Sequence, residues 1–173
     1  MTEKNTMVFS KNKIILFIFA CAFLPTASAS ALTEQQRGAI SQYCGTIQQT
    51  LKTLQQSDSR TRLKLGAFYE TFSSKYIVPL NTRLVKNNQI NTALATIQSD
   101  FSSLRSSFST DFISYSRSLE ELTAFDCKNS PDEFYEKLSD TREKRALVRN
   151  DTKKLKTLLI NFKTEIQQLK ESL

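Results

Sequence analysis

The last quarter of the chain, residues 130–173, carries a heptad pattern that constrains the fold more than any other feature. Alternating steps of four and three residues from Phe134 reach twelve positions, of which nine are apolar. These positions are Phe134, Leu138, Thr141, Arg145, Val148, Thr152, Leu155, Leu159, Phe162, Ile166, Leu169 and Leu173. The residues between them are largely charged or polar. A pattern sustained over this length predicts one long helix that packs lengthwise against other helices.

Three residues mark the start of this helix. Ser130 is a suitable N-cap, Pro131 is well tolerated at the first helical position, and Glu133 completes a Ser-x-x-Glu capping box. We therefore expect a helix over residues 131–173. At a rise of about 1.5 Å per residue it would extend roughly 60 Å, so it needs helical partners of similar length.

The first thirty residues have the composition of a secretory signal peptide. Three lysines precede the apolar run 14–24, and small residues follow Pro25. We expect residues 1–30 to be removed by cleavage after Ala29 or Ala31. The apolar run is too short to span the roughly 30 Å core of a bilayer. Lipoprotein processing at Cys21 is an alternative that the bulky Phe19 disfavours. The mature protein, residues 31–173, would then be a single exported domain without a transmembrane segment, either periplasmic, at the cell surface or extracellular.

Removal of the leader leaves a basic chain with two cysteines. The leader holds three lysines and one glutamate, and removing them from the 24 basic and 17 acidic residues of the whole chain gives a net charge of +5. Of the three cysteines, Cys44 and Cys127 remain. In an oxidising compartment we expect them to form a disulfide, and two free buried thiols are the alternative.

A first helix is expected over residues 33–78. Thr33 and Gln36 form a second capping box, and heptad positions follow it. They are Ile40, Cys44, Ile47, Leu51, Leu54, Asp58, Thr61, Leu65, Phe68 and Phe72. The polar stretch 57–62 has the composition of a loop, but the heptad phase is the same before and after it. We therefore expect one continuous helix with a polar layer at mid-length, and a short break at Asp58 is the alternative.

Pro79 interrupts the pattern that follows. Because proline lacks an N–H group and crowds the preceding turn, it predicts a kink or a stop between Lys75 and Pro79. Leu80, Leu84 and Val85 could support another turn or two. The sequence 86–89, Lys-Asn-Asn-Gln, is the clearest indication of a chain reversal.

A second helix is expected over residues 90–125. Its heptad positions are Ile90, Leu94, Ile97, Phe101, Leu104, Phe108, Phe112, Tyr115, Leu119 and Leu122. Two successive steps of four residues make 104–115 an eleven-residue repeat, which locally unwinds a left-handed supercoil. Serines are frequent on the outer faces. We interpret them as a solvated surface, and a close-approach or glycan-bearing face is the alternative.

The lengths of the three helices fit an antiparallel arrangement. If the chain folds back at Asn88, Cys127 lies opposite position 49, close to Cys44. A second reversal near Asn129 returns Leu173 to the level of Val85. The cysteines come together although their positions were not used in the count. The sequence therefore predicts an all-α fold, an elongated antiparallel three-helix bundle or coiled coil that is linked by one disulfide between Cys44 and Cys127.

The residue inventory argues against an enzyme. The chain has no histidine, the commonest general base and metal ligand. Paired cysteines supply no thiolate, and Gly38, Gly45 and Gly66 form no phosphate-binding loop. Carboxylate pairs such as Glu120 and Glu121 would need a cleft, which an elongated bundle seldom offers. We expect no catalytic residue, no cofactor and no metal site, and an enzyme of an unrecognised kind is kept as an alternative.

Polar residues at heptad positions predict a polar layer inside the bundle. The heptad pattern is interrupted by Asp58, Thr61, Arg145 and Thr152. Counting from the reversals places Arg145 close to Asp111 and about one turn from Asp58. Because a buried charge must be paired, Arg145 is expected to pair with Asp111 or Asp58. Such a layer usually fixes the register of the helices, and a gate or a ligand site is the alternative.

Basic residues from distant parts of the sequence are expected at one level of the bundle. The candidates for binding a polyanion are Arg60, Arg62, Arg142, Lys144, Arg149 and Lys153. They predict a surface for an anionic partner such as an envelope polymer, and a solvated face is the alternative. The polar faces carry no row of aromatic residues of the kind that single-stranded nucleic acid requires. Sequence-specific nucleic-acid recognition is not expected.

Two resemblances bear on function. The leader, the basic mature chain and the long helices are similar to those of periplasmic Skp-type chaperones, although no strand pattern for their oligomerising body is present. The stretches 126–135 (DCKNSPDEFY) and 79–84 (PLNTRL) resemble uncharacterised small exported helical proteins of the candidate-phyla (Saccharibacteria-type) bacteria. This second resemblance implies no activity. We expect a non-enzymatic structural or interaction module at or outside the cell envelope, with an Skp-like holdase or adaptor as the alternative. Its partner would be a protein or an anionic envelope polymer, and the oligomeric state stays open.

Overall fold

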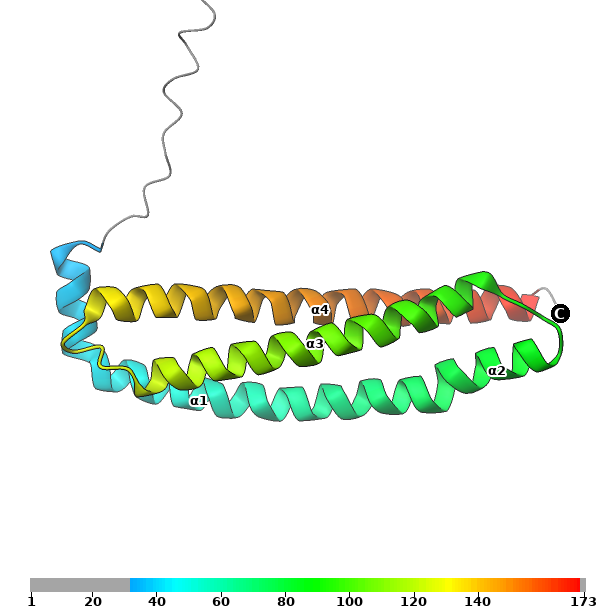
Figure 1. The fold of residues 1–173 in the computed structure, drawn as a ribbon, viewed down its shortest axis with the longest axis horizontal. Coiled ribbons are helices and arrows are strands. Elements are labelled where there is room, and N and C mark those ends of the chain that lie inside the picture. Colours follow the sequence, from blue (N-terminus) through cyan, green and yellow to red (C-terminus); the bar gives the residue numbers. More distant parts are fainter. Residues whose placement is uncertain (1–31, 172–173) are drawn as a thin grey trace, which may run out of the picture. The chain divides into compact units, whose positions relative to one another are not determined.

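The computed structural model describes residues 32–171, so the predicted signal peptide and Leu173 lie outside the described residues. The chain from Thr33 onward forms one compact unit. Its elements are α1 (Glu34–Phe72), the π-helix η2 (Ser73–Ile77), α2 (Val78–Lys86), α3 (Thr92–Ala124) and α4 (Pro131–Glu171) (Figure 1). Within the described residues every regular element is helical. The predicted all-α fold is confirmed.

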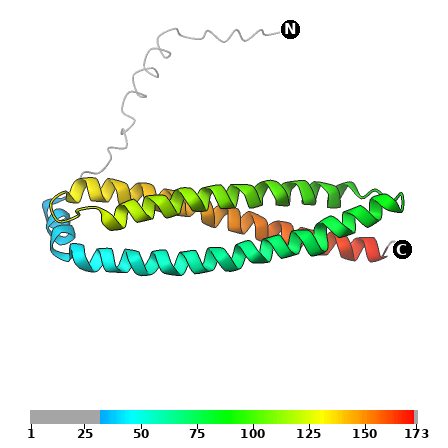
Figure 2. The ribbon, with the colours of Figure 1, turned by 60° about the horizontal axis from the view of Figure 1, so that its bottom comes forward.

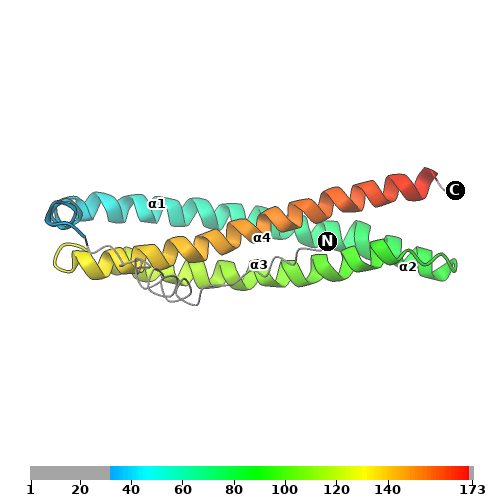
Figure 3. The ribbon, with the colours of Figure 1, turned by 90° about the horizontal axis from the view of Figure 1, so that it is seen from above.

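The helices form the expected antiparallel three-helix bundle. The first helical rod consists of α1, η2 and α2 in succession, α3 runs back along it, and α4 reverses the direction again (Figure 1). The central element is α3, which packs along α4 and also against α1, whereas α1 and α4 touch each other little. Figures 2 and 3 show that α4 crosses the other two helices obliquely. No helix in the range 32–171 combines the length and the apolar character required to cross a bilayer.

The first helix begins and continues as its sequence predicts. Thr33 accepts a hydrogen bond from the Gln36 backbone, and the Gln36 side chain accepts one from the Thr33 backbone, which completes the capping box. The helix then runs without interruption through Asp58. The alternative of a break at this residue is wrong, because a preserved heptad phase indicates that the polar stretch is helical.

The helix does not stop at Pro79. The predicted end near residue 78 is wrong, whereas the further turns that the sequence allowed after Pro79 are present. A π-helical turn precedes the proline, and the Val78 N–H donates to the Ser73 carbonyl, five residues back. The helix continues to Lys86, with Pro79 in the first turn of α2, where its missing N–H is least costly. The extra residue of the π turn also changes the register. Ile77 is therefore buried although it follows Phe72 by five positions.

The chain reverses at the predicted place. Asn88 adopts a left-handed conformation with φ of 56°, which asparagine tolerates better than most residues. Asn91 then caps α3, because its side chain accepts a hydrogen bond from the Leu94 N–H at 2.9 Å. The predicted helix start at Ile90 is two residues too early. Ile90 was also predicted as a heptad position, but its side chain is exposed.

The heptad positions of α3 supply most of the core. Every predicted position from Leu94 to Leu122 is buried except Leu104, which is partly buried against the core. In α1 one assignment is wrong, because Tyr69 is buried and Phe68 is half-exposed. Tyr69 packs edge-to-face on Phe101 and Phe108 of α3. In α4 the predicted core residue Ile166 is also exposed.

The disulfide joins Cys44 of α1 to Cys127 in the turn between α3 and α4, as predicted. Cys127 is completely buried, and Cys44 nearly so. Two further contacts hold the start of α1 against this turn. The Ser41 hydroxyl donates to the Lys128 carbonyl at 2.9 Å, and the Gln48 amide donates to the Phe125 carbonyl at 2.9 Å. The first turns of α1, blue in Figure 1, leave the direction of the rest of the helix and run across this end of the bundle.

Candidate binding groove between α1 and α4

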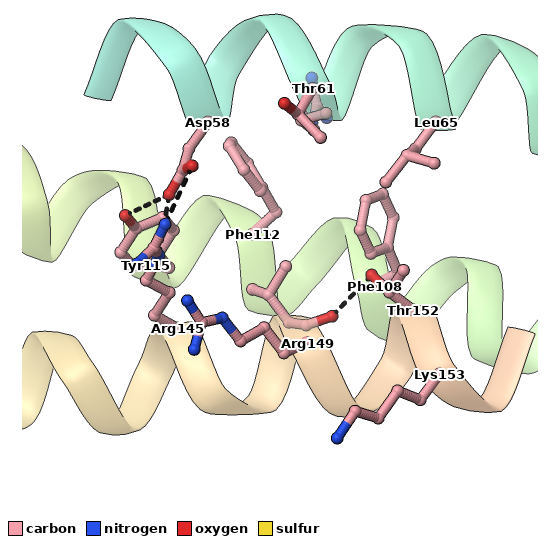
Figure 4. A pocket seen from close by; sticks show the side chains of 12 residues that line it. Asp58, Thr61, Leu65, Phe108, Phe112, Tyr115, Arg145, Arg149, Thr152 and Lys153 are labelled. Carbon is pink, nitrogen blue, oxygen red and sulfur yellow. Dashed lines mark hydrogen bonds and ion pairs between the residues drawn. The ribbon is translucent and has the colours of Figure 1, made fainter. Parts of the chain in front are cut away.

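A network of three polar side chains connects all three helical rods at mid-length. Asp58 of α1 accepts a hydrogen bond from the Tyr115 hydroxyl of α3 at 2.7 Å. The same carboxylate accepts two hydrogen bonds from Arg145 of α4, at 2.9 Å and 3.2 Å (Figure 4). Burial, together with the hydrogen bond to the Asp58 carboxylate, raises the pKa of Tyr115. The predicted pairing of Arg145 with Asp58 is confirmed.

Asp111, the other candidate partner of Arg145, belongs to a different cluster. Its carboxyl group lies against Asp151 of α4, and Asp151 is only 5% exposed. Burial, followed by a hydrogen bond and the like charge of Asp111, raises the pKa of the Asp151 carboxyl. Two carboxyl groups in contact favour the neutral form of one of them. Asp151 was not predicted, because nothing in the sequence distinguishes it from the exposed acidic residues of α4.

Tyr115 was predicted only as a packing residue. It occupies a heptad position, where its ring packs edge-to-face on Phe112, and its hydroxyl reaches Asp58. The sequence did contain a signal for this polar role, because Tyr115 follows several phenylalanines at heptad positions and differs from them only in its hydroxyl group. A buried tyrosine hydroxyl usually needs a partner, and the polar layer provided one.

A groove with a volume of about 450 Å³ lies beside this network, between α1 and α4. Figure 4 shows α1 and α4 as its two walls, with aromatic rings of α3 between them. Twelve residues line it: Asp58, Thr61, Arg62, Leu65, Phe108, Phe112, Tyr115, Arg145, Val148, Arg149, Thr152 and Lys153. Its floor is therefore largely apolar, whereas cationic side chains stand on both walls.

The groove exists because of the residues that interrupt the heptad pattern. Thr61 on α1 and Thr152 on α4 occupy positions where leucine or phenylalanine would reach across to the facing helix. Their hydroxyl groups donate to the carbonyls of Ser57 and Val148, four residues earlier in the same helices. Neither threonine therefore needs a partner across the groove, and the space between the walls stays open.

The predicted cluster of basic residues divides into two groups. Arg62, Arg149 and Lys153 line the groove, together with Arg145. Arg60 and Arg142 are exposed but do not line it, and the ammonium group of Lys144 is paired with Asp140 at 2.6 Å. The hydrogen bond from Lys144 is the main cause that lowers the pKa of Asp140. The residue count grouped these six cations, but it could not show which of them face the space between α1 and α4.

The electrostatic character of the groove is cationic. The Arg145 charge is compensated by Asp58, the one carboxylate among the lining residues. Arg62 lies over the ring of Phe112, 5.5 Å from its centroid, a cation–π geometry. Arg149 and Lys153 form no ion pair with any residue of the described range. In Figure 4 the Arg149 guanidinium lies beside Arg145, whereas the Lys153 ammonium points outward from the rim.

The cationic side chains that line the groove give it the charge to attract an anion. Residues 32–171 contain no cluster of three or more histidine, cysteine or acidic side chains placed to hold a metal ion. Comparison with known proteins adds no assignment, because no family model, no curated protein and no solved structure matches this chain significantly.

Proposed function

We propose that the protein is a non-enzymatic, exported helical-bundle module that acts at or outside the cell envelope by binding an anionic partner in the α1–α4 groove. A disulfide and the absence of a membrane-spanning helix within residues 32–171 are compatible with export. The predicted signal peptide and the resemblance to small exported helical proteins point in the same direction.

One observation carries the proposal. Four cationic side chains from two helices that are distant in sequence line a single apolar groove, and only one carboxylate lies among them. Arg145 is neutralised by that carboxylate, which leaves Arg62, Arg149 and Lys153 with an excess of positive charge. A solvated surface would be expected to intersperse acids among its cations. An anionic group entering the groove would relieve this imbalance of charge.

The test is retention on heparin across a salt series, with isolated wall polymer as a second matrix. We expect the mature protein to be retained at low salt. It should elute as the salt concentration rises, because salt ions compete with the contacts between the protein's cations and the polyanion. The variant Arg149→Gln/Lys153→Gln should elute at clearly lower salt. The matched control, Lys52→Gln/Lys163→Gln, removes the same charge at two exposed positions outside the groove and should elute close to the wild type. Equal shifts in both variants would mean that net charge, and not the groove, governs retention.

A second candidate function is that of an Skp-like holdase or adaptor, and one feature favours it. Phe68, Phe72 and Tyr76 form a row along α1 and η2, with successive ring centroids 6.0 Å and 5.5 Å apart. Phe68 and Tyr76 are 48% and 57% exposed. Exposed aromatic rows are characteristic of surfaces that contact other proteins. Suppression of the aggregation of an unfolded client protein would test this function, and Phe68→Ser/Tyr76→Ser should abolish it.

A further inference from the structure

We infer that the ligand of the α1–α4 groove is a single-chain anionic amphiphile, with a carboxylate or phosphate head group and an alkyl body. This inference rests on the proposed function, because it specifies which anionic partner the groove accepts.

The floor of the groove argues for an apolar body. Four of the lining side chains are purely hydrocarbon: Leu65, Phe108, Phe112 and Val148. A polymeric anion that bound only through its charges would leave this surface covered by water. An alkyl chain would bury it, at a gain of about 25 cal/mol for each Å² removed from water.

The size of the groove fits one chain of a small ligand. Its volume of about 450 Å³ lies in the range of roughly 300–1,000 Å³ that is typical of small-molecule sites. One turn of a protein helix, about 10 Å in diameter and about 5.4 Å long, would by itself occupy roughly 420 Å³. The groove is therefore too small for a helix of a protein partner.

The position of the cations fixes the orientation of the ligand. Arg149 lies beside the Asp58–Arg145 pair, on the α4 side of the rings, and Arg62 lies over the ring of Phe112 (Figure 4). A head group near Arg149 would meet an arginine that has no carboxylate partner in the described range. The chain would then extend over Phe112 and Phe108 toward Leu65. An arginine fork binds a carboxylate or a phosphate in this way.

The experiment compares three probes by isothermal titration calorimetry: decanoate, decanol and acetate. Decanoate carries both parts of the inferred ligand, decanol carries the chain without the charge, and acetate carries the charge without the chain. We expect one decanoate per protein. Decanol and acetate should each bind at least roughly tenfold more weakly, since a charge-assisted hydrogen bond and a buried chain each contribute more than about 1.4 kcal/mol.

Two variants place the binding in the groove. Thr61→Phe fills the groove from α1 and should abolish decanoate binding. It leaves all four cations in place, so it should lower retention on heparin less than Arg149→Gln/Lys153→Gln does. Its matched control is Thr53→Phe, an exposed α1 threonine whose hydroxyl also bonds to the carbonyl four residues earlier but does not line the groove. Thr152→Phe, from the facing wall, repeats the test if Thr61→Phe fails to fold. The melting temperature of each variant reports whether it is folded.

Each remaining outcome contradicts the inference in a distinct way. If decanoate binds no better than acetate, the groove takes only the anionic group, and the proposed function stands as long as Arg149→Gln/Lys153→Gln lowers retention on heparin. If decanol binds as tightly as decanoate, the groove is merely apolar. If Thr61→Phe binds decanoate like the wild type, the site lies elsewhere. If the protein is not retained on heparin and also fails to bind decanoate, the proposed function and the inference both fall.

Discussion

The polar network at mid-length can be measured by a double-mutant cycle on Asp58 and Arg145. Asp58 is the central group, because it accepts all three hydrogen bonds that connect α1 to Tyr115 of α3 and to Arg145 of α4. Asp58→Ala, Arg145→Ala and the double variant complete the cycle. Tyr115→Phe removes one hydroxyl and serves as the smallest perturbation in the same network.

The magnitude follows from the partial burial of the pair. The side chains of Arg145 and Asp58 are 30% and 20% exposed. At an effective dielectric constant near 20, two unit charges about 4 Å apart attract each other by roughly 4 kcal/mol before desolvation. Desolvation and residual solvent screening offset a large part of this attraction. We therefore expect a coupling free energy of about 1.5 kcal/mol.

The single variants should cost more than the coupling alone. Asp58→Ala leaves the Arg145 guanidinium without a counter-charge and the Tyr115 hydroxyl without an acceptor, so we expect the free energy of unfolding to fall by about 3 kcal/mol. Tyr115→Phe removes both the donor and its need for a partner, and should cost about 1 kcal/mol. Urea denaturation followed by circular dichroism gives these values, provided that the slope of the transition is unchanged.

Two results would refute this reasoning. A coupling below about 0.5 kcal/mol would place the pair among exposed ion pairs that contribute little. A double variant more stable than the wild type would show that the network costs stability and serves register or ligand binding instead.

Three further predictions concern the disulfide, the buried carboxyl pair and the groove. Cys44→Ala/Cys127→Ala should lower the free energy of unfolding by up to about 4.5 kcal/mol in urea denaturation, because the bond closes a loop over a separation of 83 residues. Asp151→Asn should raise the free energy of unfolding at neutral pH in the same assay, since it removes a buried carboxyl that contacts Asp111. Thr152→Leu should raise stability by about 1 kcal/mol by filling the groove, and should weaken decanoate binding measured by calorimetry.

The pH dependence supplies the control for the carboxyl pair. The folded pKa of Asp151 is raised, so its contribution to stability is fully present below the ordinary pKa of aspartate and is lost as the pH rises toward the folded value. The stabilisation by Asp151→Asn should therefore vanish at roughly pH 3, where both states of the wild type are protonated. A constant gain at every pH would refute the carboxyl explanation. For the disulfide, a loss below about 1 kcal/mol would mean that residual structure in the unfolded chain already keeps Cys44 and Cys127 close without the bond. For Thr152→Leu, lower stability with unchanged binding would mean that the groove cannot take a larger side chain and is not the ligand site.

Long-range arrangement could be predicted from this sequence because its heptad pattern is long and its turns are few. The heptad pattern predicted which face of α3 is buried, and the helix lengths predicted the antiparallel arrangement. Counting residues from the reversals gave the disulfide between Cys44 and Cys127. These predictions depend only on the 3.6-residue period of the helix and on its rise, which are nearly the same in every helix.

Local changes of period could not be predicted in the same way. Phe68 and Tyr69 are adjacent aromatic residues, and the choice between them depends on packing against Phe101 and Phe108. The π turn before Pro79 adds one residue to a helical turn, and proline alone does not distinguish such a turn from a kink or a stop. The candidate site was predicted in part for a related reason. A residue count gives the positions of Arg60 and Arg62 along the bundle. Only the packing of the helices shows that, of these two arginines, Arg62 lines the groove and Arg60 does not.

Four polar residues that interrupt the heptad pattern converge on the candidate site. Asp58, Thr61, Arg145 and Thr152 all line the groove. The fifth polar residue at a predicted heptad position, Thr141, does not line it and shares a hydrogen bond with Ser118 of α3. A bundle selected for stability alone would place large apolar residues at these positions, because each would bury additional area and close the space. Here the charged pair holds α1 and α4 at a fixed separation, and the two threonines keep the space between them open. Polar residues that converge on one cationic groove at a cost in stability are what the proposed binding function predicts. If Thr152→Leu both stabilises the protein and weakens the binding of decanoate, both effects will have one cause, the filling of the groove by an apolar side chain.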